Sequence, residues 1–325
     1  MALPPRYITV WVGGDLPYTA VLSLASMLAV DPDATIELHH LAPIADRHEL
    51  GLLRATGRFE VHSIQLPSLL DDELLGVLEQ IPQGAHAAAS NIVRLALLHR
   101  RGGVYLDLDT FLLRPLTGFA FGAFVGLERV WELDRERVER GLRVRHWPAT
   151  AAWGTVWALK RADTAITRGR LRIAGLTRWL DERLDTEQLN NAVLGAPAGS
   201  ALTAALLERA KRCDPGVRYA LGPNLLHDVV KADHRLATVM SPEVLFAVPP
   251  SESHRIFWDR YLQLPPRASV VHYVQSNHRK LLHSVTPGDP RFDRPELFWS
   301  LGRAADEWLT KVCAPRGERS TCPSW

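Results

Sequence analysis

Residues 90–109 of this chain read SNIVRLALLHRRGGVYLDLD, and this stretch decides the fold. Its apolar spacing predicts a helix over 86–101, and Gly102-Gly103 is typical of a helix end. The apolar run over 104–108 then predicts a short buried strand. A helix that leads directly into a strand is typical of an α/β domain.

The polar residues of this segment have a regular placement. Asn91 and Arg94 are three residues apart, so on the predicted helix they share a face. Along the predicted strand, Tyr105, Asp107 and Asp109 point to the side opposite the apolar residues. Two carboxylates at the carboxyl end of a strand lie where open α/β sheets bind ligands.

Asp107 and Asp109 would repel each other unless a cation lies beside them. Mg²⁺ or Mn²⁺ meets this need, because both ions take oxygen ligands and link carboxylates to substrate phosphates. The simpler alternative is a strand end with two solvated aspartates. A glycosidase fits poorly, since its two carboxylates flank the scissile bond from opposite sides.

Residues 104–113 are also similar to the first motif of haloacid-dehalogenase-type phosphatases, in which the first Asp is a nucleophile and the second a general acid. That family usually has Gly after the second Asp, where this chain has Thr110. It also needs a later acidic pair for Mg²⁺, whereas Asp71-Asp72 precedes the motif here. A phosphatase is therefore the weaker alternative.

Strand and helix patterns alternate ahead of the central segment. The strands are expected over 7–12, 35–41 and 59–66, and the helices over 17–30, 45–56 and 71–80. This succession predicts a parallel sheet with helices on both faces. After the central segment we expect an exposed helical insertion over 128–147, helices over 186–194, 200–213 and 295–312, and a strand over 269–274.

Composition excludes several classes of protein. The 325 residues carry a net charge of +2 with 23% charged residues, which argues against disorder and against a dedicated nucleic-acid binder. Cys213, Cys313 and Cys322 form neither a disulfide framework nor a CxxC metal motif. No signal peptide and no bilayer-spanning stretch is apparent, so we expect a cytoplasmic protein without stable membrane insertion.

Residues 90–109 resemble the sugar-binding region of DXD glycosyltransferases, whose pattern is Ser-Asp-x-x-Arg, a helix and Gly-Gly-x-Tyr-x-Asp-x-Asp. These enzymes include yeast outer-chain mannosyltransferases and the catalytic domains of large clostridial toxins. Three other stretches of this chain fit in the same order: 10–14, 190–197 and 271–273. The resemblance therefore extends over about residues 8 to 278.

This resemblance implies an α/β GT-A fold with a Rossmann-like, mostly parallel sheet and helical insertions. It implies one domain over 1–325, with a nucleotide-binding half of about 1–115 and an acceptor-binding half of about 116–325. The implied activity is a retaining, metal-dependent transfer from a nucleotide sugar, most often a UDP-sugar, to a glycan, small-molecule or peptide hydroxyl. The implied cofactor is Mn²⁺ or Mg²⁺.

The resemblance also implies roles for individual residues. The implied catalytic residues are Arg94, Asp107, Asp109 and Asn191. The implied donor-binding residues are Trp11, Val12, Gly13, Asn91, Arg94, Asp107, Asn190 and His278. The implied metal ligands are Asp109, the more direct one, with Asp107 and His272.

Trp11 matches a Trp that stacks on the nucleotide base, and Glu187 is a candidate for acceptor contact. Each of these assignments has a structural alternative. Trp11 and His272 also fit a buried core, and Asn190 or Asn191 also fits a helix cap. These alternatives stay open on the sequence alone.

Two positions depart from the family pattern. Asn91 stands where the family has Asp, and an amide both donates and accepts hydrogen bonds, so donor choice is expected to differ. Ser276-Asn277-His278 replaces the family's Ser-Trp after the late His. These departures leave a catalytically weak nucleotide-sugar-binding protein as the second alternative.

Overall fold

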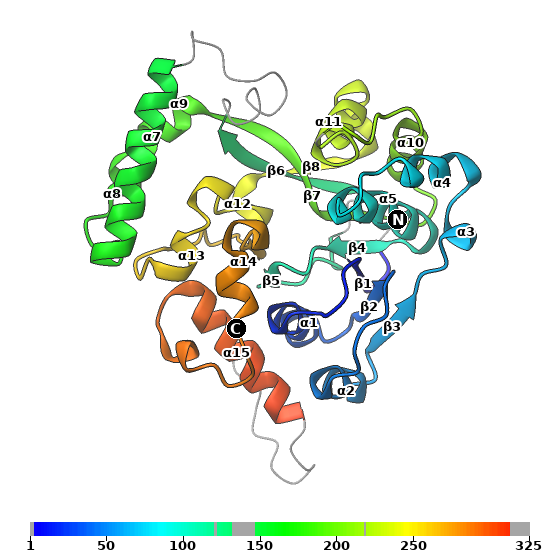
Figure 1. Cartoon of the computed structure of the whole chain (residues 1–325), viewed down its shortest axis with the longest axis horizontal. Helices are drawn as coiled ribbons and strands as arrows, with labels where there is room; N and C mark the ends of the chain where they lie inside the picture. Colours follow the sequence, from blue (N-terminus) through cyan, green and yellow to red (C-terminus); the bar gives the residue numbers. More distant parts are fainter. Residues whose placement is uncertain (1–2, 120–121, 132–146, 218, 313–325) are drawn as a thin grey trace.

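The computed structural model describes residues 3–119, 122–131, 147–217 and 219–312. A central twisted sheet is covered by helices on both faces, and a helical arm projects from one side (Figure 1). The expected α/β class with a mostly parallel, Rossmann-like sheet is confirmed, and the arrangement agrees with the expected GT-A fold.

The main sheet has seven strands in the order β3-β2-β1-β4-β7-β6-β8. Strands β3, β2, β1 and β4 run parallel, β7 runs antiparallel to both β4 and β6, and β8 is parallel to β6. A separate antiparallel pair is formed by β5 and β9. The strands are β1 Arg6–Trp11, β2 Thr35–His40, β3 Phe59–Ser63, β4 Gly103–Leu106, β5 Thr110–Leu112, β6 Phe124–Trp131, β7 Asp185–Ala196, β8 Thr238–Met240 and β9 Val270–His272.

The helices form three groups. Those of one face of the sheet and its margin are α1 Tyr18–Val30, α2 His48–Ala55, α12 Pro242–Leu245, α13 Arg255–Trp258, α14 Gln275–His283 and α15 Leu297–Val312. Those of the other face are α3 Leu66–Leu69, α4 Asp72–Glu79, α5 His86–Arg101, α10 Ala201–Ala210 and α11 Pro223–Ala232. The arm consists of α7 Trp147–Ala162, the π-helical turn η2 Asp163–Thr167, α8 Ile173–Leu176 and α9 Arg178–Leu184.

Alternating side chains of the strands divide the core into two clusters. On β4, Val104 and Leu106 pack with α1 and α15, whereas Tyr105 packs with α5. On β1, Tyr7 belongs to the cluster of Val104 and Leu106, and Ile8 belongs to the cluster of Tyr105. The sheet is therefore buried on both faces, as expected for parallel strands.

The two positions between α5 and β4 require glycine, because the backbone of other segments comes close to them. Gly102 and Gly103 have φ of 66° and 121°. A Cβ on Gly102 would come 2.5 Å from the backbone nitrogen of Ala198, and one on Gly103 would come 2.7 Å from the carbonyl oxygen of Arg6. The Gly-Gly pair thus permits the helix to turn directly into the central strand.

Most of the predicted elements are confirmed, with two exceptions. The helix expected over 186–194 is wrong, because this segment is part of β7 and pairs with β6 and β4. The insertion expected over 128–147 is wrong for residues 128–131, which extend β6, while residues 132–146 lie outside the described residues. In both segments, pairing with distant strands outweighs local helix propensity.

The expected strand over 104–108 also ends earlier, at Leu106. Asp107 continues the hydrogen-bond ladder through its N–H to the Ala192 carbonyl at 2.9 Å, and a turn over 108–109 leads into β5. The two aspartates therefore flank a turn at the end of β4 rather than one face of a strand. Cys213 is a half-buried free thiol, and Cys313 and Cys322 lie outside the described residues.

Among the described residues, every helix is too short or too polar to cross a lipid bilayer.

Candidate active site

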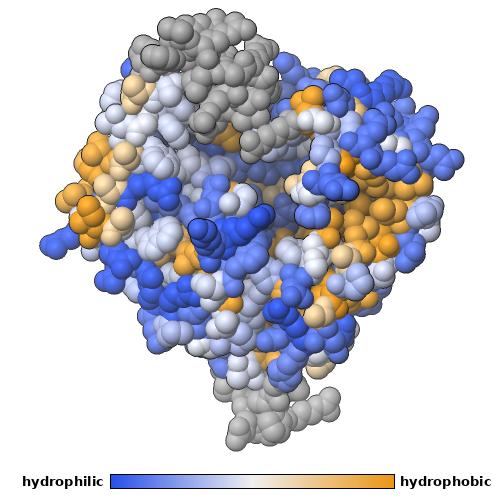
Figure 2. Space-filling model, in the orientation of Figure 1, coloured by the Kyte–Doolittle hydropathy of each residue, from blue (hydrophilic) through white to orange (hydrophobic). Residues whose placement is uncertain are grey.

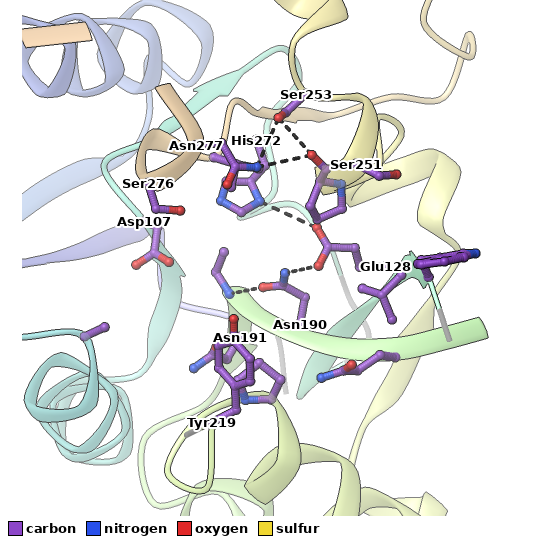
Figure 3. Close-up of a pocket in the computed structure, with 18 of the residues that line it drawn as sticks. Asp107, Glu128, Asn190, Asn191, Tyr219, Ser251, Ser253, His272, Ser276 and Asn277 are labelled. Atoms are coloured by element: carbon purple, nitrogen blue, oxygen red, sulfur yellow. Dashed lines mark hydrogen bonds and ion pairs between the residues drawn. The ribbon is translucent and has the colours of Figure 1, made fainter. Parts of the chain in front are cut away.

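A cavity of about 760 Å³ opens at the carboxyl end of β4 (Figure 3). Segments far apart in the sequence contribute to its wall: α5, the turn after β4, β6, β7 and the chain from 250 to 278. Its polar lining includes Asn91, Arg94, Asp107, Glu128, Gln188, Asn190, Asn191, Ser253, His272, Ser276, Asn277 and His278. Seven of the residues that the sequence analysis proposed therefore meet at one cavity: Asn91, Arg94, Asp107, Asn190, Asn191, His272 and His278.

Arg94 holds Asp107 in place. Arg94 is 5% exposed, and its guanidinium lies 3.0 Å (Nη2) from Oδ1 and 3.4 Å (Nη1) from Oδ2 of Asp107. The same Nη1 donates to the Asn191 carbonyl at 2.6 Å, and the group lies 4.4 Å from the ring centroid of Tyr105. Tyr105 in turn donates its hydroxyl to Asp107 at 2.5 Å. Burial raises the pKa of Asp107, and Arg94 opposes this effect.

Asp109 has a different set of partners. Its Oδ2 accepts the Gln275 backbone N–H at 2.9 Å and lies 3.4 Å from Nε2 of His272. Burial alone would raise the pKa of this carboxyl, but the charge and hydrogen bond of His272 and the Gln275 N–H lower it. Burial likewise acts to lower the pKa of His272, yet Asp109 and Glu128 raise it well above its usual value. Asp109 does not line the cavity itself, and it contacts the wall through His272.

A bulge in β7 positions the two asparagines. Val125 of β6 pairs with Leu194, but the next residue, Gly126, pairs with Asn190, so three residues of β7 have no partner on β6. Bulges of this kind redirect side chains. Asn190 donates Nδ2 to Oε2 of Glu128 at 2.5 Å, and Asn191 donates Nδ2 to Oδ1 of Asn91 at 2.9 Å.

Glu128 is a site residue that the sequence analysis missed. It is 5% exposed and lies on β6 between Asn190 and His272, as Figure 3 shows. One carboxylate oxygen, Oε1, lies 3.8 Å from Nδ1 of His272 and has no hydrogen-bond partner. The only sequence signal is an acidic residue in a charged stretch, and such a stretch is typical of an exposed helix.

Trp11 at the end of β1 and the two residues after it are not part of the cavity lining. The Trp11 indole is half-buried and donates Nε1 to the Gly14 carbonyl at 2.9 Å. Its ring lies beside Gly13, where an added Cβ would come 3.3 Å from Trp11 Cζ2. Trp11, Val12 and Gly13 do not line the cavity, and the stacking of Trp11 on a nucleotide base stays a prediction. Glu187 is an exposed residue of β7 and does not line the cavity either.

His278 lines the cavity but faces an apolar neighbourhood. It is 7% exposed, its Nε2 lies 3.0 Å from the Ser253 hydroxyl, and its ring centroid lies 4.5 Å from that of Phe257. Burial and the nearby charge of Arg161 lower the pKa of His278 to about 4. The imidazole is therefore neutral at neutral pH, and its predicted contact with the donor stays a prediction.

The side chains around Asp109 fit a divalent cation in their chemistry. Carboxylate oxygens and an imidazole nitrogen are a donor set that Mn²⁺ accepts. The short gap between Asp109 Oδ2 and His272 Nε2, 3.4 Å, lets both atoms contact one ion. Asp107, however, is turned toward Arg94 and Tyr105, and these three predicted ligands do not form a tight group. Within the described ranges, the group of three whose ligand atoms all lie within 4.8 Å is Glu37, Glu60 and His62.

That other group lies on β2 and β3 and is already neutralised. Glu37 is bound by Arg6 Nε at 2.7 Å and Arg101 Nε at 2.8 Å. Two guanidinium groups at hydrogen-bond distance disfavour a further cation there. The charge of Glu37 is therefore already compensated without a metal ion.

Comparison with known proteins agrees with the sequence resemblance. Residues 63–126, from the end of β3 to β6, match the family model described as "Glycosyltransferase sugar-binding region containing DXD motif". A comparison with curated protein sequences found no match.

The solved structures that match this chain are distant from it in sequence. They include "PaToxG Glycosyltransferase", at 12% identity over 93% of this chain and 86% of that chain, with a TM-score of 0.44. The UDP-bound glycosyltransferase domain from the YGT toxin shares 13% identity over 74% of this chain and 79% of that one, with a TM-score of 0.39. The galactosyltransferase LgtC with donor and acceptor sugar analogs shares 15% identity over 96% and 98%, with a TM-score of 0.40. No residue role follows from likenesses this distant. Residues 63–126, which contain Asp107 and Asp109, are thus similar to the sugar-binding region of DXD-type glycosyltransferases.

Proposed function

We propose that this protein is a retaining, metal-dependent glycosyltransferase that moves a sugar from a nucleotide sugar, with UDP as the expected nucleotide, to an acceptor hydroxyl. The observation that carries the proposal is the convergence of Arg94, Asp107, Asn191 and His272 on one cavity, beside Asp109. These residues come from four segments of the chain, and two of the segments, those of Arg94 and Asp107, lie within the residues that match the DXD family model. We also propose that residues 1–325 act as one catalytic unit.

The donor diphosphate needs positive charge as the glycosidic bond breaks. A bound Mn²⁺ or Mg²⁺ would supply a Lewis acid that stabilises the negative charge on the leaving diphosphate. Asp109 and His272 would hold this ion, and Asp107 would be the further ligand that the sequence resemblance implies. The buried guanidinium of Arg94 fixes the Asp107 carboxylate and the Asn191 carbonyl, so both are in place before substrate binds.

The transferred sugar occupies the part of the cavity between the asparagines and Glu128. The side chains of Asn191 and Asn91 are hydrogen-bonded to each other. Together they present amide groups that can donate to and accept from sugar hydroxyls. Glu128 has one free carboxylate oxygen in this region, and we propose that it orients a hydroxyl of the sugar or the acceptor. Attack by the acceptor from the face of the departing diphosphate retains the anomeric configuration.

A transfer assay tests this function. A panel of UDP-sugars is incubated with Mn²⁺ or with EDTA, and release of UDP and the anomer of the product are followed by NMR. We expect turnover of at least one donor with Mn²⁺, loss of turnover with EDTA, and a retained anomer. Tight Mn²⁺-dependent UDP-sugar binding without turnover would support the binding-protein alternative, and turnover of a simple phosphate monoester would support the phosphatase.

A further inference from the structure

The helical arm of residues 147–184 has three polar side chains in its interior and several large apolar side chains on its surface. Lys160, Asp163 and Thr164 are buried, with 5%, 6% and 3% exposure. Lys160 Nζ binds Asp181 at 2.6 Å and Glu252 at 2.5 Å, and Asp163 accepts the backbone N–H groups of residues 171 and 173. The arm is therefore held together by buried charged and polar groups.

Several of its large apolar side chains are exposed, whereas Trp153 and Trp157 are half-buried and line the cavity. Nine large hydrophobic residues are exposed in the described part of the chain, and five of them fall within residues 159–179. They are Leu159, Ile166, Leu171, Leu176 and Trp179, with exposures of 50%, 80%, 59%, 68% and 59%. Figure 2 shows part of this set as an orange area at the left edge, where Figure 1 draws α7 and α8. We call these five residues the arm patch.

Basic side chains are interspersed with the arm patch. Residues 161–183 contain six arginines but three acidic residues, one of which is the buried Asp163. Arg170 and Arg172 lie on both sides of Leu171, and Arg183 lies over the ring of Trp179, 5.6 Å from its centroid. The exposed surface of the arm is thus apolar and cationic together.

This combination identifies the kind of partner. A second copy of the chain would bring the same arginines against each other, and the like charges would oppose the contact. An anionic lipid surface matches both properties, because apolar side chains enter the acyl boundary while arginines contact lipid phosphates. The described helices lack a membrane span, so the contact is with the surface of the bilayer.

We propose that the arm patch and its arginines dock the protein on membranes that contain anionic lipids. The proposal does not depend on which sugar is transferred or on whether the cavity is active. It predicts that the full chain binds vesicles of phosphatidylcholine mixed with phosphatidylglycerol and does not bind vesicles of phosphatidylcholine alone. Added salt weakens the electrostatic part of this binding.

Vesicle sedimentation of the full chain tests the proposal with two pairs of substitutions. Ile166→Ser with Leu176→Ser removes apolar contacts and is expected to weaken binding by ~10-fold or more. Arg170→Gln with Arg183→Gln is expected to weaken binding by about fivefold per arginine. The matched controls are Val217→Ser, at a site 53% exposed elsewhere, and Arg235→Gln, whose side chain is 91% exposed, and both are expected to bind like the wild type.

Because all the changed side chains are exposed, we expect each variant to fold, and circular dichroism checks this. Equal binding of the wild type to neutral and anionic vesicles, or no binding to either, would overturn the proposal. So would variants of the arm patch that bind like the controls. A wild-type dimer in sedimentation velocity that becomes a monomer in Ile166→Ser with Leu176→Ser, without vesicle binding, would show that the patch is a self-association surface instead.

Discussion

Oε1 of Glu128 and Nδ1 of His272 lie 3.8 Å apart, both buried, and neither has a hydrogen-bond partner. Unsatisfied buried atoms are costly unless a ligand or solvent completes them. The pair lies on the wall of the cavity, next to Asn190 and on the side of His272 opposite Asp109. Glu128 therefore connects the metal side of the proposed active site with its sugar side.

Glu128→Gln is the first test of this connection. The amide keeps an oxygen for Asn190 but loses the charge, so we expect turnover to fall by ~10²-fold while the donor KM stays near its wild-type value. Steady-state kinetics with the best donor measures both. Glu243→Gln, an exposed change on α12, serves as the control. A Glu128→Gln enzyme with wild-type turnover would remove Glu128 from the mechanism.

Gly222→Ala tests the amide pair of Asn91 and Asn191. A Cβ at this glycine would come 2.8 Å from Nδ2 of Asn91 and 3.3 Å from Nδ2 of Asn191, so the pair must shift. We expect kcat/KM for the donor to fall ~10- to 100-fold, because small displacements of positioning groups have large effects. Gly51→Ala on α2, where an added Cβ meets nothing within 4 Å, is the matched control. Equal kinetics of the two variants would show that the amide pair does not bind the donor.

The buried His278 makes the free energy of unfolding depend on pH. Burial and the charge of Arg161 lower its pKa from 6.5 to about 4. The unfolded chain thus binds a proton near pH 6.5 that the folded chain does not bind until about pH 4. Its contribution to stability is complete above pH 6.5 and is lost as the pH falls toward 4, by about 1–2 kcal/mol after allowance for solvent access. Urea unfolding across this range should show a shallower fall for His278→Gln than for the wild type, and equal slopes would contradict the assignment.

Lys160→Met tests how the arm is attached. The change leaves the half-buried Asp181 without its cation and leaves Glu252 with Arg255 alone. We expect the free energy of unfolding to fall by about 1–3 kcal/mol, or the arm to become a site of rapid proteolysis. Lys231→Met, an exposed change on α11, should alter stability by less than about 0.5 kcal/mol. An arm that resists protease equally in both variants would show that the ion cluster is not its anchor.

The first half of the fold follows well from the sequence. Parallel strands joined by amphipathic helices have local patterns, so the order of residues alone predicts β1 to β4 and the Gly102-Gly103 turn. The same local patterns bring Arg94 and Asp107 together, and the two side chains form an ion pair at the cavity wall. The elements that sequence patterns miss depend on distant partners.

Strand β7 illustrates this dependence. Glu187, Gln188 and Leu189 favour a helix locally, and only pairing with β6 makes them a strand. Since the pattern of β6 itself resembles a helical insertion, the sequence does not predict the hydrogen bond between the side chains of Asn190 and Glu128. Trp11 is expected over a nucleotide base, and the hydrogen bond of its indole to Gly14 is a loop contact that no spacing rule predicts.

The proposed function requires that Asp109, with His272, hold a divalent cation that binds a nucleoside diphosphate. Isothermal titration of UDP into the wild type and Asp109→Asn, each with Mn²⁺ and with EDTA, tests it directly. We predict Mn²⁺-dependent UDP binding by the wild type and a loss of at least ~10-fold in affinity for Asp109→Asn. Wild-type affinity that is equal in Mn²⁺ and EDTA, or full Mn²⁺-dependent binding by Asp109→Asn, would contradict the account.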